Sequence, residues 1–297
     1  MSGESRDETG DDDRTRSDSD ERESTEGDRS GTDGRDPPPA GRRPIEAQKQ
    51  DSPLYALLGA LLVAVGGIAG AFAASAVVFL GISLFAVPLS PVSSFGLSFL
   101  AGAIGFVAVA VLYIRYRGRD PIQYIGFRVP SLRDLKWIVG GYLGAIALVV
   151  ASGIALTVLQ VDPETTNRAA EAGLERPELL LWLVPLSFLV IAPGEELLFR
   201  GAVQSRLREA FSPAVAITVT AAVFAILHFF SLTGGAGGRF IAISILFLPS
   251  LVFGAVYEYT GNIVAPMLVH GAYNSTLVLL VYITLQQFPA EELAVLL

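Results

Sequence analysis

Residues 54–85 read LYALLGALLVAVGGIAGAFAASAVVFLGISLF, thirty-two residues without a charged side chain. A helix that crosses the hydrocarbon core of a bilayer needs roughly 20 mainly apolar residues. This run is therefore long enough to span a membrane. Pro88 and Pro91 follow it directly, and because proline breaks the hydrogen-bond ladder of a helix, they indicate where the span ends.

Further apolar runs predict six more spans. They cover about residues 94–113, 137–159, 179–199, 213–230, 240–256 and 263–285. Pro185 and Pro193 lie inside the fourth run, and we expect them to interrupt its helix. Charged residues make up 17% of the chain, against about 25% in soluble domains. The sequence thus predicts an all-α, polytopic transmembrane helix bundle of about seven spans.

The first 50 residues differ from the rest in composition. They hold 15 Asp or Glu and 9 Lys or Arg, a net charge of 9 − 15 = −6 within the chain's total of −8. Such a segment cannot bury enough apolar surface to offset its ordering entropy. We therefore expect residues 1–52 to form an acidic, disordered tail and residues 53–297 to form the transmembrane domain.

Charges in the loops predict the orientation. The loop after the second span is basic, whereas the loop after the third is mostly acidic. Basic short loops stay cytoplasmic, so we expect the N-terminus in the cytoplasm, the C-terminus outside, and a multi-pass protein of the cell membrane. The basic residues used are Arg42, Arg43 and Lys49 before the first span, Arg115, Arg117, Arg119, Arg128, Arg133 and Lys136 after the second, and Arg200, Arg206 and Arg208 after the fourth.

Ionisable side chains inside spans are costly and mark functional sites by default. The chain has no cysteine, which excludes thiolate chemistry, and only two histidines, both in predicted spans. The candidates are Glu195, Glu196, Arg200, His228, Glu258, His270 and Asn274.

Spacing groups these candidates. Glu196 and Arg200 are four residues apart, so they share a helix face and can pair. Glu195 is turned by about 100° from Glu196, which leaves its carboxylate available for chemistry. His270 and Asn274 also share a face.

A carboxylate and an imidazole can activate one water molecule, and a second imidazole and a carboxamide can stabilise the resulting oxyanion. The residues therefore suit amide hydrolysis. The same nitrogen and oxygen donors could also hold a zinc ion.

Three motifs lie in order on the last predicted spans. They read EELLFR at 195–200, FAILH at 224–228 and HGAYN at 270–274. Together they resemble the EExxxR, FxxxH and HxxxN pattern of the CPBP intramembrane proteases, which include the type II CAAX prenyl endopeptidases and the Abi bacteriocin-immunity proteins. The resemblance covers about residues 180–280, the motif core of the predicted protease domain.

The resemblance implies a role for each matching position. Glu195 is expected to be the general base and His228 its partner on the catalytic water. His270 and Asn274 are expected to stabilise the oxyanion. Glu196 and Arg200 are expected to form a structural pair, with Phe224 packed beside the site.

The resemblance leaves the cofactor and the substrate open. It allows a divalent metal such as zinc, with Glu195, His228 and His270 as candidate ligands, and equally a metal-free glutamate mechanism. The expected partners are the lipid bilayer and a peptide or protein substrate, which the family allows to be lipidated; no nucleic acid is expected. A proton-coupled transporter and a non-catalytic immunity or binding scaffold remain the alternatives.

Overall fold

The computed structural model describes residues 52–287. The expected tail, its basic residues and the C-terminal end lie outside these residues, so their predictions stay open. The long helices are α1 (Pro53–Leu84), α2 (Pro91–Tyr116), α4 (Leu132–Leu159), α9 (Pro213–Leu227), α10 (Ala236–Thr260) and α11 (Val264–Gln287). A further helical stretch, Glu178–Arg208, lies between α4 and α9.

Seven helices of the described residues are long and apolar enough to cross a membrane. No strand occurs among residues 52–287. The predicted all-α bundle with seven spans is therefore confirmed, and the chain is a multi-pass membrane protein.

Proline and small polar residues set where several helices begin. Proline occupies the first position of α1, α2, α9 and the short helix α3 (Pro121–Tyr124), where its missing N–H costs nothing. The preceding residue accepts a backbone hydrogen bond through its side chain in three of them: Ser90, Asp120 and Ser212. These signals divide the apolar sequence into separate spans.

The third span begins earlier than expected, at Leu132 instead of Trp137. Ser131 and Asp134 form a capping box there, and Arg128 binds the Asp134 carboxylate. The apolar run did not indicate this first turn of the helix, because the turn is polar.

The fourth span also differs from expectation. It does not end at Phe199 but continues to Arg208. Pro185 and Pro193 do not break it, because two π-helical segments, η2 (Ser187–Ile191) and η3 (Leu197–Gln204), absorb the change in hydrogen bonding. The α-helical parts of the stretch are α6 (Glu178–Leu186), α7 (Ala192–Glu196) and α8 (Ser205–Arg208).

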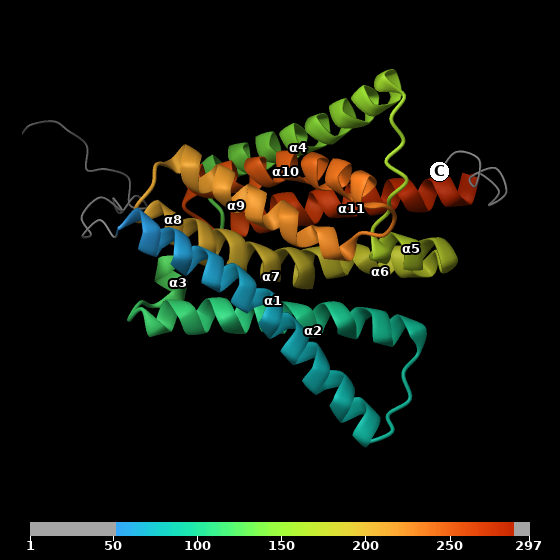
Figure 1. Ribbon diagram of the computed structural model, residues 1–297, viewed down its shortest axis with the longest axis horizontal. Helices are drawn as coiled ribbons and strands as arrows, with labels where there is room; N and C mark the ends of the chain where they lie inside the picture. Colours follow the sequence, from blue (N-terminus) through green and yellow to red (C-terminus); the bar gives the residue numbers. More distant parts are fainter. Residues whose placement is uncertain (1–51, 288–297) are drawn as a thin grey trace, which may run out of the picture. The chain divides into compact units, whose positions relative to one another are not determined.

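The stretch from α6 to α8 is central in the bundle. It packs against α1, α2, α9, α10 and α11, whereas α4 packs against α10 and α11 on the side away from α2 (Figure 1). The helix α1 crosses α2 where Gly70 meets Gly105; a Cβ on Gly105 would lie 2.4 Å from the Gly70 backbone. Small residues thus allow the close helix contact that is common in membranes.

The connections gather at the two ends of the bundle. At one end the basic loop after α2 meets the end of α10, where Arg128 donates to the Thr260 carbonyl. At the other end the loop before the short helix α5 (Arg168–Glu175) meets the loop after α9, through a bridge between Asn167 and Leu232. Arg117, after α2, also binds Glu209, directly after α8. The basic loops among the described residues therefore share one end, as the orientation prediction requires, while the side of the membrane stays a prediction.

Candidate functional site

Glu195 and Glu196 lie on α7, a single α-helical turn between the π-helical segments η2 and η3. Pro193 lacks an N–H and Gly194 lacks a side chain, so helix α2 can approach closely here; a Cβ on Gly194 would lie 2.9 Å from that of Ala103. π-Helical turns within α-helices occur frequently at functional sites. Here they place two consecutive carboxylates well inside the span.

Glu196 is fully buried and holds two partners with one oxygen. Its Oε1 accepts from Arg200 Nη1 at 3.0 Å and from His270 Nδ1 at 2.7 Å. The pairing with Arg200 is the one expected from their spacing, and the hydrogen bond to His270 adds helix α11. One carboxylate thus joins two helices inside the apolar core.

Arg200 is fully buried as well. Its Nη2 donates to the carbonyl and to the hydroxyl oxygen of Ser250, at 2.9 and 2.8 Å. Its guanidinium carbon lies 4.9 Å from the ring centre of Phe224 and 5.5 Å from that of Phe253. These ring faces attract the cation electrostatically, so Arg200 is held on several sides.

Glu195 faces the two histidines. Its Oε1 lies 4.0 Å from His228 Nε2, and its Oε2 lies 3.7 Å from His270 Nε2. Both distances exceed a direct hydrogen bond. Glu195 retains 17% side-chain exposure while Glu196 has none. Within residues 52–287, the more accessible carboxylate is therefore the one with no hydrogen-bonded partner.

Each histidine has its other ring nitrogen occupied. His228 begins the short 3₁₀ segment η4 (His228–Ser231), and its Nδ1 is 2.7 Å from the Phe224 carbonyl, which can only accept. His270 Nδ1 faces the Glu196 carboxylate in the same way. Hydrogen therefore lies on Nδ1 in both rings, and Nε2 points toward Glu195. In a neutral ring that Nε2 is an acceptor.

Asn274 stands one turn after His270 on α11 and is half-buried. It makes no hydrogen bond within residues 52–287. The structure thus brings Glu195, His228 and His270 together and leaves the Asn274 amide on the adjacent turn, with its donors unused in that part of the chain.

The three candidate metal ligands do not converge tightly. Two atoms bound to one tetrahedral zinc ion lie about 3.4 Å apart, since each is about 2.1 Å from it. The pairs around Glu195 are 3.7 and 4.0 Å apart. Among the described residues, no group of three His, Asp or Glu side chains is arranged to hold a metal ion. The side chains as placed do not fit a zinc site.

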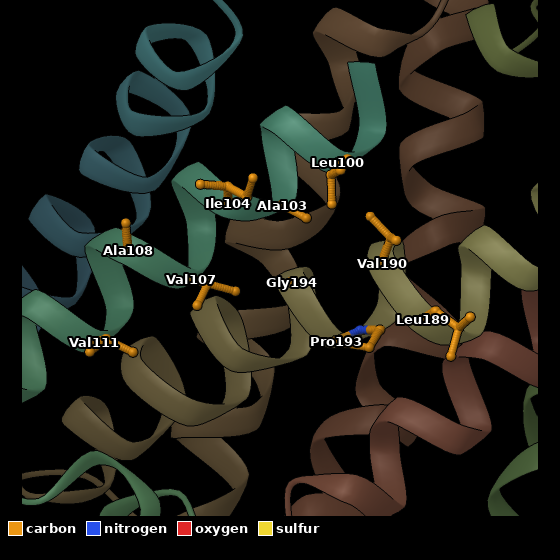
Figure 2. A pocket seen from close by; sticks show the side chains of 10 residues that line it. All are labelled: Leu100, Ala103, Ile104, Val107, Ala108, Val111, Leu189, Val190, Pro193 and Gly194. Atoms are coloured by element: carbon orange, nitrogen blue, oxygen red, sulfur yellow. The ribbon is translucent and has the colours of Figure 1, made fainter. Parts of the chain in front are cut away.

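An apolar groove of about 410 Å³ adjoins α7 (Figure 2). It lies between α2 and the segment from η2 to α7. Pro193 and Gly194, which directly precede Glu195, form part of its wall. The other lining residues are Leu100, Ala103, Ile104, Val107, Ala108, Val111, Leu189 and Val190. No residue of this lining carries a charge, so the groove suits hydrocarbon.

Sequence reasoning missed two residues at the site. Ser250 binds Arg200, and Phe253 stacks on the His270 ring. Neither residue is ionisable, and neither belongs to one of the three motifs. A hydroxyl residue directly after a proline inside an apolar span was the available signal for Ser250.

One of the comparisons with known proteins found a match. Residues 177–276 match the model of a protein family described as type II CAAX prenyl endopeptidase Rce1-like. The matched range contains all three motifs. No curated protein and no solved structure matched the chain.

Proposed function

Since residues 177–276 make this chain a member of the type II CAAX prenyl endopeptidase family described as Rce1-like, we propose that it hydrolyses a peptide bond inside the membrane, with Glu195 as general base. One observation carries the proposal. An accessible carboxylate, without a hydrogen-bonded partner in the described part of the chain, lies between two imidazoles whose Nε2 atoms both point toward it. Three separate helical segments supply these groups.

The first step is activation of water. A water molecule about 2.8 Å from both Glu195 Oε1 and His228 Nε2 would donate one hydrogen to each. The Nδ1–H bond to the Phe224 carbonyl keeps Nε2 of His228 as the acceptor. As the water oxygen attacks the peptide carbonyl carbon, its proton passes to Glu195 and the carbonyl electrons move to oxygen.

The second step is collapse of the tetrahedral intermediate. Glu195, now a carboxylic acid, gives its proton to the leaving nitrogen while the carbon–nitrogen bond breaks. The products are a carboxylic acid and an amine, and Glu195 is again ionised. No step needs a metal ion.

The oxyanion needs donors during both steps. The Asn274 amide has unused hydrogens in the described part of the chain. His270 has a stricter requirement, because its Nδ1–H already binds Glu196. It donates through Nε2 only as an imidazolium, which carries hydrogen on both nitrogens.

The groove beside Glu195 favours a substrate with a hydrocarbon group. Its lining is uncharged and is continuous with the turn that carries the general base. This apolar lining supports a prenylated peptide as the substrate over an unmodified polar one. We expect purified protein to cleave a farnesylated CAAX-type peptide more efficiently than the same peptide without the lipid. Equal cleavage of the two peptides would show that the lipid does not contribute to substrate recognition.

The direct test compares carboxylates on one helical stretch. Glu195→Gln and His228→Ala are expected to abolish cleavage of the farnesylated peptide. Glu178→Gln, at the exposed start of α6, is the matched control and should cleave at the normal rate. Unchanged cleavage by both site variants would refute the assignment. Proton flux into liposomes that depends on Glu195 would instead favour the transporter. A folded wild-type protein that cleaves none of the peptides would favour the non-catalytic scaffold.

Metal dependence can be tested separately. The steps above predict that activity persists after exhaustive chelation and that metal analysis of active protein finds no stoichiometric zinc. Activity that is lost on chelation and restored by added zinc would show that the side chains rearrange around an ion.

The predicted orientation can be tested on a clean background. The chain has no cysteine, so single cysteines at Arg115 and at Thr233 report on the two ends of the bundle. We expect an impermeant thiol reagent added to intact cells to label Thr233→Cys and not Arg115→Cys. The reverse pattern would place the basic loops outside.

A further inference from the structure

Helix α10 carries none of the three motifs, yet it contacts the site at two places. Ser250 and Phe253 are three residues apart and share a face of the helix. Each retains only 1% exposure. Together they touch Arg200 and His270, the two partners of Glu196.

Phe253 controls the plane of the His270 ring. The two rings are stacked, with centres 4.7 Å apart and planes inclined by 19°. The hydrogen bond from Nδ1 to Glu196 fixes one direction of the imidazole but allows the ring to pivot about it. Stacking on Phe253 opposes this rotation, and only one ring orientation directs Nε2 toward Glu195.

Ser250 affects the same imidazole ring indirectly, through Arg200 and Glu196. Its hydroxyl and carbonyl oxygens both accept from Arg200 Nη2. Arg200 holds Glu196 through Nη1, and Glu196 holds His270. Displacement of the guanidinium would therefore move the carboxylate that orients the imidazole.

We propose that Phe253 and Ser250 are positioning residues for the reaction: α10 fixes the His270 imidazole, through ring stacking and through the path from Ser250 by way of Arg200 and Glu196. Neither residue is assigned contact with the substrate. The inference deepens the proposed function and rests on it where turnover is concerned. The ring placement itself can be measured without turnover.

The two histidines allow a direct spectroscopic test. Protein labelled with ¹⁵N-histidine and purified with a tag free of histidine contains two imidazole rings, because the chain has only two histidines. His270→Gln assigns the remaining signals to His228. We expect His270 to show hydrogen on Nδ1, and we expect Phe253→Leu to shift or broaden the His270 signals while those of His228 remain in place.

Kinetics supply the second measurement, with the farnesylated peptide as the probe. A reacting group displaced by about 1 Å can cost 100-fold in rate. Phe253→Leu is expected to lower kcat by about 10- to 100-fold with KM changed less than about twofold. Phe247→Leu is the matched control, because Phe247 lies on the same helix and packs against the cluster of Ala225, Leu232 and Ile243.

Ser250 offers a pair of variants that changes little volume. Ser250→Ala removes one acceptor for Arg200 and should lower kcat and move the His270 signals, whereas Ser250→Thr keeps a hydroxyl and should restore both. Ser244→Ala removes a hydroxyl that only binds the Phe240 carbonyl on the same helix, and it should change neither. If Phe253→Leu does not fold, this pair decides the matter.

The outcomes separate the two proposals. Wild-type His270 signals and wild-type kcat in Phe253→Leu and Ser250→Ala would overturn the positioning role. Displaced His270 signals, together with cleavage that does not depend on Glu195, would support the positioning role and refute the proposed general base.

Discussion

Two ionic clusters in this chain are built around a glutamate, and they differ in how much water reaches them. Glu196 lies inside the bundle with Arg200 and His270, and the side chains of the ion pair have no exposure. Glu209 lies at the end of the bundle, directly after α8, and binds Arg117 at 2.6 Å and Arg206. The side chain of Arg117 keeps 23% exposure.

Further side chains approach the carboxylate of the outer cluster. Arg119 lies 3.6 Å from Glu209 as a third arginine, and the Tyr124 hydroxyl donates to Glu209 at 3.1 Å. Burial, followed by the nearby Glu209 carboxylate, raises the pKa of Tyr124 well above its ordinary value near 10. Tyr124 therefore stays a neutral donor at physiological pH.

The difference shows what membrane depth demands. At the edge, water and salt screen charges, so several arginines can approach one carboxylate. A fully buried charge in the hydrocarbon region needs its own partner, because an isolated charge there costs several kcal/mol. In the inner cluster, Arg200 pairs with the Glu196 carboxylate. The His270 imidazole donates to Glu196, and Arg200 donates to Ser250.

The largest expected effect comes from breaking the inner pair. Arg200→Ala leaves the Glu196 charge in the core with His270 alone. Removal of one partner of a buried pair costs about 3–5 kcal/mol. We expect this loss of unfolding free energy for the purified protein in detergent, along with low membrane levels. Wild-type stability would show that Glu196 is not held by Arg200.

A smaller effect is expected when both charges are removed together. In Glu196→Gln combined with Arg200→Met, no unpaired charge remains, and such replacements cost less than a single deletion. The double variant should recover at least about 1 kcal/mol relative to Arg200→Ala. The same unfolding assay measures it, and a double variant less stable than Arg200→Ala would contradict the ion-pair account.

The outer cluster should respond more weakly and depend on salt. Glu209→Gln removes the carboxylate that the arginines share, and we expect a loss of about 1–2 kcal/mol in unfolding free energy. Salt weakens partly exposed pairs, so the loss should shrink at high ionic strength, whereas that of Arg200→Ala should not. If salt changed the stability loss equally in the two variants, the two clusters would not differ in their exposure to water and ions.

The smallest effect is expected for the pair between Arg208 and Glu258. Their side chains retain 18% and 21% exposure at a separation of 2.9 Å. Pairs open to water are worth about 0–1 kcal/mol. Arg208→Ala should therefore change the melting temperature little, and it serves as the control for Arg200→Ala.

The two clusters also show what sequence can predict. Glu196 and Arg200 are four residues apart on one helix, so their pairing follows from helix geometry. The partners Arg117 and Tyr124 lie far from Glu209 in the chain, at the end of another helix and beyond it. No local spacing indicates such contacts, because they depend on how the helices pack.

The same limit applies to the site. Motif spacing predicted Glu195, His228 and His270 as site residues, and these lie close together in the structure. Span lengths predicted the seven helices. The continuation of the fourth span through Pro193 was not predicted, because π-helical turns leave no simple sequence pattern. The roles of Ser250 and Phe253 depend on the rotation of α10 against α11, which side-chain packing decides.

The central claim is that neighbouring carboxylates have separate tasks, reaction at Glu195 and support at Glu196. The most direct measurement compares Glu195→Gln with Glu196→Gln for both cleavage rate and unfolding. A general base contributes about 10²- to 10⁴-fold, so Glu195→Gln should lose that much kcat at wild-type stability, while Glu196→Gln should be destabilised. Full cleavage by Glu195→Gln, or equal destabilisation of the two variants, would contradict the account.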